Sequence, residues 1–180
     1  MSQITSDTPT NLVVGAGSVY RNQQALGASS GDNVFRIERD LFTPELNGAK
    51  GKLLGTDYVT RSEGFLETSI AEVSTEALEA GWPGSRSTSP TSEGAATTTI
   101  DESDARRIPL ASYADWELQV ERLGGGEFQF EVDDALHTGN FEGSLSDKGM
   151  FLPKLVLASR WDPADLTASP HRIRILAAAS

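Results

Sequence analysis

Apolar and polar residues alternate along several short stretches of the chain, which is the pattern of β-strands with one buried face. The clearest example is a pair of runs, WELQVERL at residues 116–123 and EFQFEVDD at residues 127–134, separated by three glycines. We expect these runs to form a hairpin. The residues predicted to face the core are Leu118, Val120, Phe128, Phe130 and Val132, and those predicted to face solvent are Glu117, Gln119, Glu121, Glu127, Gln129, Glu131 and Asp133.

Weaker alternation predicts further strands at residues 11–20, 34–40, 139–147, 151–160 and 171–176. In the strand at 34–40 we expect Phe35 and Ile37 to be buried, with Arg36, Glu38 and Asp40 on the opposite, wet face. Asp162 followed by Pro163 predicts a turn before the last strand.

The segment FLETSIAEVSTEALEAGWPG, residues 65–84, predicts a strand followed by one short helix. The strand is expected to bury Leu66, Thr68 and Ile70. Ser74 is a typical N-cap residue, and Glu76 lies in the first turn, where the helix dipole favours an acid. Gly81 and Pro83 then predict the helix end.

Three stretches have little apolar periodicity. Residues 1–10 are polar and predict a flexible N-terminal arm, so residues 11–180 form the single domain. Residues 41–57 contain several glycines and predict a long extended loop. The Ser/Thr-rich stretch at 85–99 begins a surface loop expected to run to residue 112. The predicted fold is therefore mainly β, an antiparallel sandwich or barrel with one short flanking helix and a long loop.

The glycines in NLVVGAGSVY suggest a dinucleotide-binding loop, but the pattern fails. That loop needs a third glycine and a following helix, whereas Tyr20 stands at the third position and turn-forming residues follow. Without a helical crossover a parallel β-α-β unit cannot be built. We therefore expect an ordinary strand, in which Gly15 and Gly17 mark a kink or a close backbone approach.

The composition narrows the function classes. The chain has 180 residues, 26 acidic and 15 basic, and a formal charge of −11, which disfavours nucleic-acid binding. It has no cysteine, and no stretch reads as a signal peptide or a membrane span. We expect synthesis in a cytoplasm and no membrane association.

No residue pattern indicates catalysis, a metal site or a cofactor. Asp133, Asp134 and His137 could be read as metal ligands, but acids at a hairpin end explain them more simply. Glu38, Glu67 and Glu131 could be paired carboxylates of a glycosidase, yet acids on wet strand faces are common. We predict a protein that is not an enzyme.

The charges are unevenly distributed. Acids dominate the wet strand faces, while basic residues gather at Lys50, Lys52, Arg106, Arg107, Arg160, Arg172 and Arg174. Such segregation suits copies that meet positive to negative.

The order of these features resembles the major tail tube protein of long-tailed phages. The resemblance covers about residues 11–176 and rests on NLVVGAGSVY, VFRIERD, GAKGKLLGTDYV, LETSIAEVSTEAL with WPG, SRWDPADL and HRIRIL. It implies a virion tail protein, a sandwich subunit that forms hexameric rings stacked into a hollow tube. The tube's acidic lumen would conduct viral DNA without binding it specifically. The implied partners are further copies of the chain, a tape measure protein, a tail terminator and baseplate or distal tail proteins.

The resemblance assigns expected roles to three groups of residues. The expected lumen-facing residues are Glu38, Asp40, Glu67, Glu127, Glu131 and Asp133. The loop at 41–57 would reach a neighbouring ring through Phe42, Glu45, Lys50, Lys52, Leu53 and Leu54. The expected basic contacts between subunits are Arg106, Arg107, Arg172 and Arg174.

Two other function classes stay open at this point. The first is the inner tube of a contractile injection machine or a type VI secretion system, which would move protein cargo. The second is a non-catalytic β-sandwich binding module such as a carbohydrate binder. That module would need exposed aromatic residues, and we expect Trp82, Trp116 and Trp161 to serve in packing instead.

Overall fold

The computed structural model describes residues 13–44, 51–52, 54–71, 74–88, 98–102, 107–122, 125–142 and 152–177. Within these residues the chain is mainly β, with antiparallel strands and a single short α-helix. The predicted fold class is therefore confirmed. The N-terminal arm predicted at 1–10 lies outside the described residues.

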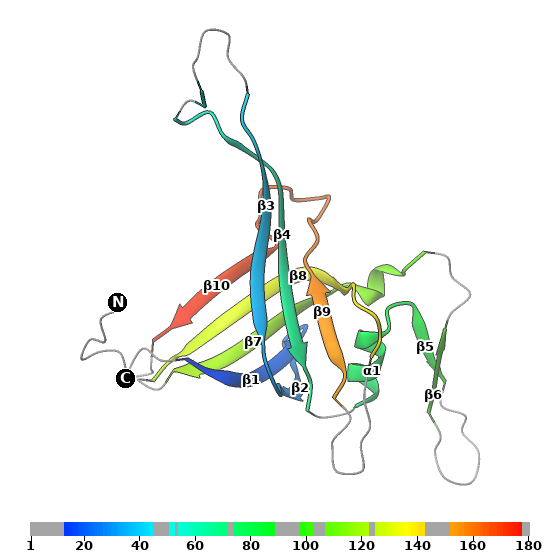
Figure 1. Cartoon of the computed structure of the whole chain (residues 1–180). Coiled ribbons are helices and arrows are strands. Elements are labelled where there is room, and N and C mark those ends of the chain that lie inside the picture. Colours follow the sequence, from blue (N-terminus) through cyan, green and yellow to red (C-terminus); the bar gives the residue numbers. More distant parts are fainter. Residues whose placement is uncertain are drawn as a thin grey trace, which may run out of the picture.

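Eight strands form one antiparallel sheet that folds over into two facing layers (Figure 1). The fold-over occurs in β8, whose first part pairs with β7 and β10 and whose last residues pair with β9. A register shift and the positive φ of Asp134 (47°) mark the bend. The first layer contains β2 (Gln24–Ala28), β1 (Val13–Arg21), β7 (Ala114–Arg122), β8 (Glu127–His137) and β10 (His171–Leu176). The second contains β9 (Lys154–Ala158), β4 (Tyr58–Ser69) and β3 (Val34–Phe42).

The hydrophobic core lies between these layers. Leu66, Ile70, Leu155 and Leu157 from the second layer are fully buried, as is Val132 from the first. The predicted inward residues of β4 are confirmed, because Leu66, Thr68 and Ile70 have almost no exposed surface. Trp116 is also buried, at 3% exposure, so its predicted packing role is confirmed. The alternation in β4, β7 and β8 thus sets which faces meet.

One side of the sandwich is closed by backbone hydrogen bonds between β2 and the end of β4. Ser29 bridges Ile70, and the Ala71 amide donates to the Ala28 carbonyl at 2.8 Å. The two layers are therefore joined on this side, as in a partly closed barrel.

The predicted helix is present as α1 (Thr75–Gly81). The Ala77 amide donates to the Ser74 hydroxyl at 3.1 Å, which confirms the N-cap. Ala77 and Ala80 pack into the core, and a Cβ at Gly81 would lie 3.0 Å from the Phe141 ring. The helix therefore covers the end of the sandwich beside β9.

Several sequence predictions need correction. The surface loop predicted at 85–112 contains a separate two-stranded ribbon, β5 (Ser85–Thr88) and β6 (Thr99–Glu102), and a 3-10 helix, η2 (Leu110–Ser112). The two strands of the ribbon are joined by backbone pairing, with an exposed ion pair between Arg86 and Asp101 at 2.7 Å across them. A strand was predicted at 139–147, but β8 ends at His137 and residues 139–142 form no strand. Residues 143–147 lie outside the described residues. Residues 24–28, read as turn formers, form β2.

The glycine segment is an ordinary strand, as predicted. Gly17 lies in β1, opposite Val120 of β7, and a Cβ there would overlap the Gln119 carbonyl oxygen. The register shift between Val13 and Gly17 marks the irregularity. None of the helices in the described part of the chain is long and apolar enough to cross a membrane.

Candidate functional site

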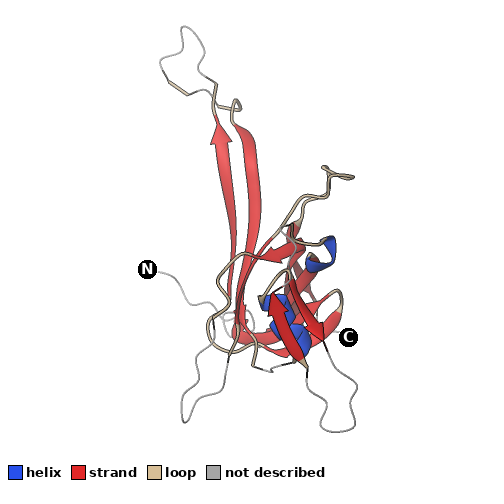
Figure 2. Cartoon of the chain, turned by 90° about the vertical axis from the view of Figure 1, so that its right-hand side faces the viewer, coloured by secondary structure: helices blue, strands red, loops and turns tan. Residues whose placement is uncertain are grey.

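The outer half of the β3–β4 hairpin projects far beyond the rest of the molecule (Figure 2). Every residue of β3 from Ile37 to Phe42 is exposed, and so are the first four residues of β4. Two cross-strand pairs near its end are apolar: Leu41 with Val59, and Phe42 with Tyr58. This hairpin therefore carries an apolar surface that no other described part of the chain covers.

The loop predicted at 41–57 begins later than expected, because Leu41 and Phe42 belong to β3. β3 and β4 remain hydrogen-bonded as far as Phe42 and Tyr58, so the stem of the hairpin is longer than the glycine-rich sequence indicated. Among the residues expected to reach a neighbour, Phe42 is 56% exposed, and Lys52 and Leu54 are exposed. Glu45, Lys50 and Leu53 lie outside the described residues.

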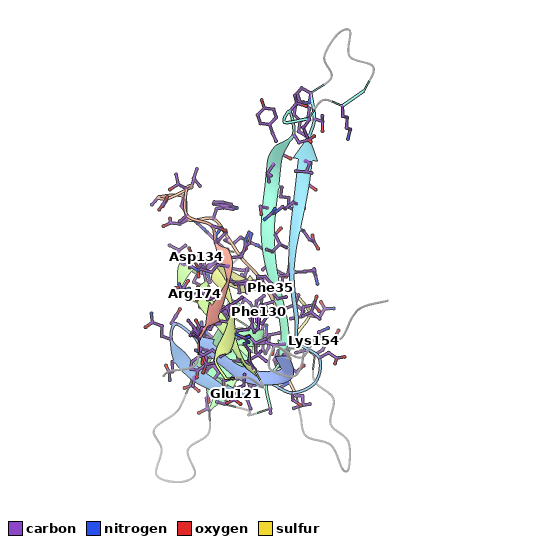
Figure 3. The ribbon with its side chains drawn as sticks, turned by 90° about the vertical axis from the view of Figure 1, so that its left-hand side faces the viewer. Phe35, Glu121, Phe130, Asp134, Lys154 and Arg174 are labelled. Carbon is purple, nitrogen blue, oxygen red and sulfur yellow. The ribbon has the colours of Figure 1, made fainter. Side chains whose placement is uncertain are left out.

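The sandwich is open on the side between β3 and β10. Within the described residues, β3 pairs only with β4 and β10 only with β8, so each has a free edge. Ile173 and Ile175 lie opposite Phe130 and Phe128 on the core side of the sheet, yet they are 50% and 62% exposed. Figure 3 shows Phe35 beside Phe130, with ring centroids 5.3 Å apart, where the two layers last touch. Beyond this contact the apolar face of β10 has no cover.

The predicted lumen-facing acids lie on two different outer faces. Glu127, Glu131 and Asp133 are on the outer face of the first layer, because Val132 between them points into the core. Glu38, Asp40 and Glu67 are on the outer face of the second layer, opposite the side that carries Leu66. The core separates these faces, so the six acids do not share one surface.

The outer face of the first layer has an excess of acids. Five carboxylates lie on it against two arginines: Glu117, Glu121, Glu127, Glu131, Asp133, Arg172 and Arg174. Arg172 contacts both Glu131 and Asp133, and Arg174 Nε lies 3.0 Å from Glu131 Oε1. Glu131 is 7% exposed, so the expectation that it is a free surface acid is wrong. Burial raises the pKa of Asp133, although Arg172 opposes the effect.

The outer face of the second layer is balanced. Four carboxylates face four cations there: Glu38, Asp40, Glu63, Glu67, Arg36, Arg61, Lys154 and Arg160. Arg36 contacts Glu67 and lies 3.1 Å from Glu38, while Lys154 Nζ lies 3.4 Å from Glu67. The hydrogen bond from Arg36, with help from Lys154, lowers the pKa of Glu67 despite partial burial. These acids are neutralised within the chain.

The basic residues predicted to contact other subunits behave differently from one another. Arg172 and Arg174 are committed to Glu131 and Asp133 in their own chain. Those partners are on β8, directly beside β10, a pairing that the sequence did not indicate. Arg107 is exposed, and Arg106 lies outside the described residues.

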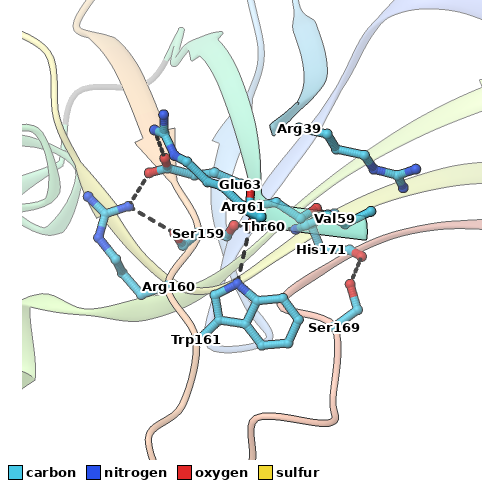
Figure 4. Close-up of a pocket in the computed structure, with 11 residues that line it drawn as sticks. Arg39, Val59, Thr60, Arg61, Glu63, Ser159, Arg160, Trp161, Ser169 and His171 are labelled. Atoms are coloured by element: carbon cyan, nitrogen blue, oxygen red, sulfur yellow. Dashed lines mark hydrogen bonds and ion pairs between the residues drawn. The ribbon is translucent and has the colours of Figure 1, made fainter. Parts of the chain in front are cut away.

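A cavity of about 730 Å³ lies at the base of the projecting hairpin (Figure 4). Its charged lining consists of Arg39, Arg61, Arg160 and Glu63. The Trp161 indole forms part of the wall and donates from Nε1 to the Ser62 carbonyl at 3.1 Å. Trp161 is 40% exposed, so the prediction that it packs in the interior is wrong. Its place beside arginines gives the cavity an aromatic and a cationic wall.

His171 closes the inner end of this cavity. Its Nε2 is 3.3 Å from the Ser62 hydroxyl, and the Ser169 hydroxyl donates to its carbonyl at 2.9 Å. Gly64 permits this packing, because a Cβ there would lie 2.5 Å from the His171 Cβ. Burial lowers the pKa of His171, and the nearby charge of Arg39 lowers it further. His171 therefore anchors β10 against β4.

The residues once considered as metal ligands have other contacts. His137 is buried and accepts a hydrogen bond at Nδ1 from the Val156 amide at 2.8 Å, while Asp133 contacts Arg172. No group of three potential metal-ligating side chains occurs in the described ranges. These interactions explain His137 and Asp133 as structural residues.

Two features of this surface were not predicted from the sequence: the open side and the cavity. Both depend on which strands become neighbours. The alternation in HRIRIL, residues 171–176, was sufficient to predict an apolar face on β10. It did not indicate that this face would be left exposed.

No protein-family model matches the chain, and the search of curated proteins gives no match either.

Proposed function

We propose that this protein is a structural virion component that polymerises as stacked hexameric rings into the hollow tail tube of a long-tailed phage. The observation that carries the proposal is the open side of the sandwich. A free β10 edge, a free β3 edge and two exposed isoleucines lie there together. A soluble chain gains by covering such a surface, and a second copy offers both complementary edges.

Contacts within a ring would form along these free edges. Pairing of one copy's β10 with a neighbour's β3 is a heterologous contact, which closes into a ring when the rotation between copies permits it. Ile173 and Ile175 would become buried in the same step. Burial of two isoleucines contributes about 1.5–3 kcal/mol each when complete, and less here because they are already half-covered.

Contacts between rings would use the projecting hairpin. Its apolar pairs, Leu41 with Val59 and Phe42 with Tyr58, lie well outside the subunit body (Figure 2). A neighbouring ring would cover them. This keeps the expectation drawn from the resemblance, with the stem of the hairpin, in addition to its loop, making the contact.

The lumen would be lined by the outer face of the first layer. That face has five carboxylates and two arginines, whereas the face with Glu38, Asp40 and Glu67 is neutral overall. An acidic bore repels the phosphates of DNA, so that the genome passes without adhering. The proposal therefore retains Glu127 and Asp133 as lumen residues and moves Glu38, Asp40 and Glu67 away from the bore. Glu131 lies beneath the same face as the buried partner of Arg172 and Arg174.

The test is electron microscopy and sedimentation of the purified chain over a range of concentrations. We expect rings or tubes of uniform width for the natural sequence. The double variant Ile173→Ser/Ile175→Ser should stay folded and monomeric, because both side chains are already largely exposed in the single chain. The matched control is Leu110→Ser/Leu166→Ser, which removes two exposed leucines elsewhere and should still assemble. Monomers of the natural sequence at every concentration would refute the proposal.

The binding-module alternative gains support from one observation, the half-exposed Trp161 in the cavity. Sugar-binding sites stack a sugar ring on such a side chain. The remaining wall is rich in arginine, which favours an anionic ligand over a neutral sugar. Affinity electrophoresis in gels that contain neutral polysaccharides distinguishes the two functions, since a module would be retarded and a tube subunit would not.

A further inference from the structure

The outer face of the first layer contains two like-charge pairs on the same two strands. Glu117 lies directly opposite Glu131, and Glu121 lies directly opposite Glu127. Two carboxylates in such positions repel each other and destabilise the pairing of the strands. In the first pair the repulsion is offset, because Arg172 and Arg174 of β10 both contact Glu131 and Gln119 donates to Glu117 at 2.8 Å.

The second pair has no such compensation. β10 places Leu176, not an arginine, opposite Glu127. Neither Glu121 nor Glu127 forms an ion pair with any side chain in the described part of the chain. The nearby guanidinium of Arg122 lies over the Phe128 ring, 5.6 Å from its centroid. Glu121 is exposed and Glu127 is half-buried, and the two carboxylates lie together at the end of the body far from the hairpin, where Figure 3 labels Glu121.

The opposite end of the body carries a positive charge that its own chain does not balance among the described residues. In the cavity at the hairpin base, Arg61 and Arg160 both contact Glu63, and Arg61 also lies 3.9 Å from Asp40. Arg39 lines the same cavity, is exposed and forms no ion pair with a described residue. Arg61 and Arg160 are thus balanced by Glu63 and Asp40, and Arg39 is the cation of the cavity that has no ion-paired carboxylate among the described residues.

We propose that the Arg39 cavity of one copy receives the Glu121 and Glu127 carboxylates of a second copy. The proposal rests on the proposed function, and it names the polar contact between successive rings. His171 at the first residue of β10 lines the cavity, whereas Leu176 at its last residue lies opposite Glu127. Because the two surfaces lie at opposite ends of β10, the contact is head to tail and repeats in one direction without closing. Each carboxylate pair gains the cations that its own chain lacks, and the register of stacking is fixed by charge.

The geometry of the cavity suits this occupant. A volume of about 730 Å³ lies within the range of cavities that enclose small ligands, so two glutamate side chains fit. The ring of Trp161, held by its hydrogen bond to Ser62, offers an apolar wall to their methylene groups.

The first test is charge reversal at the cavity. Arg39→Glu should leave the isolated subunit folded, with an unchanged melting temperature, because Arg39 is exposed and forms no ion pair with a described residue. The concentration at which half of the protein is in stacked rings should rise about tenfold or more. Arg39→Lys keeps the charge and should retain most of the stacking.

The second test is a charge swap. Glu121→Arg alone should weaken stacking, because like charges then meet at the same contact. The double variant Arg39→Glu/Glu121→Arg should restore the natural stacking concentration to within about threefold. The control Arg39→Glu/Glu142→Arg has the same net charge but reverses an exposed acid without an ion pair in the described chain, and it should not restore stacking.

The outcomes separate this inference from the proposed function. If the natural sequence never assembles, both are refuted. If the natural sequence forms tubes and Arg39→Glu forms them equally well, the contact is refuted and the tube stands. Failure of the swap, with both single variants impaired, also refutes the contact. The contact is also refuted if a short single-stranded oligonucleotide binds the cavity through Arg39 and the stacking of rings stays unchanged.

Discussion

The two halves of β4 differ in their surroundings although they belong to one continuous strand. From Gly64 to Ser69 alternate residues are buried between the layers, while from Tyr58 to Arg61 every residue is exposed. Both halves pair with β3 along their length. Backbone pairing alone therefore does not distinguish them. The inner half is held by apolar packing, whereas the outer half has an apolar surface that the described residues leave exposed.

The charged residues show the same contrast. On the inner half, Glu67 is enclosed by Arg36 and Lys154. On the outer half, Asp40 lies 3.9 Å from Arg61, and both side chains are largely exposed. Exposed pairs contribute little to stability, so the described ion pairs add little to the stability of the outer half.

The largest difference in stability between the two halves is expected when a cavity is created in the inner half. Leu66→Ala should lower the free energy of unfolding by about 2–5 kcal/mol, because a fully buried side chain is removed. Val59→Ala in the outer half should change it by less than about 0.5 kcal/mol. Urea unfolding of the monomer measures both. Equal losses would mean that the hairpin is packed against its own body.

The boundary between the halves is tested by Gly64→Ala. The new Cβ would lie 2.5 Å from the His171 Cβ, which forces the end of β10 to move and should cost about 1–3 kcal/mol. The matched control is Gly51→Ala in the connection of the hairpin, where no atom lies within 4 Å of the new Cβ. Thermal unfolding compares the two variants, and a harmless Gly64→Ala would contradict the packing of His171.

The ion pair between Glu67 and Arg36 predicts that the free energy of unfolding depends on pH. Since the pKa of Glu67 is lowered in the folded chain from its usual 4.5, its contribution is complete above that pH and disappears as the pH falls through the lowered value. Glu67→Gln should cost about 1 kcal/mol at pH 7 and progressively less as the pH falls below 4.5. Glu38→Gln, which removes an exposed partner of the same Arg36, should cost less at every pH. Unfolding free energies from pH 3 to 7 provide the measurement.

The smallest effect on the monomer should come from Leu41→Ser/Val59→Ser. These two exposed residues face each other near the end of the hairpin, so their loss should cost less than about 1 kcal/mol. Assembly should nevertheless be impaired, which sedimentation at increasing concentration measures. The control is again Leu110→Ser/Leu166→Ser. Normal assembly by the hairpin variant would show that the outer half has no partner.

Local patterns in the sequence were sufficient for the strands that face the core on one side. The alternation in β4, β7 and β8 predicted Leu66, Leu118 and Val132 as core residues, and all three are buried. The Ser74 cap and the glycine turn before β8 were also predicted correctly. These features depend on residues close together in the chain, where periodicity and capping act directly.

Features without such a local signal were missed. The β5–β6 ribbon has no apolar face, and β2 lies among turn-forming residues, so neither has a periodic pattern. Trp161 was expected to pack inside because tryptophan usually does, but the loop that carries it ends at the cavity wall.

By itself the sequence determined the β-rich class, the faces of the main strands and the overall acidity, since these follow from residue types and their spacing. Only the tertiary structure decided that the predicted lumen acids lie on two opposite faces and that Arg172 and Arg174 pair with Glu131. It alone left Ile173 and Ile175 uncovered and placed unpaired charges at the two ends of the body. The reason is that each depends on which distant strands become neighbours, and a strand pattern specifies a buried face without naming the surface that covers it.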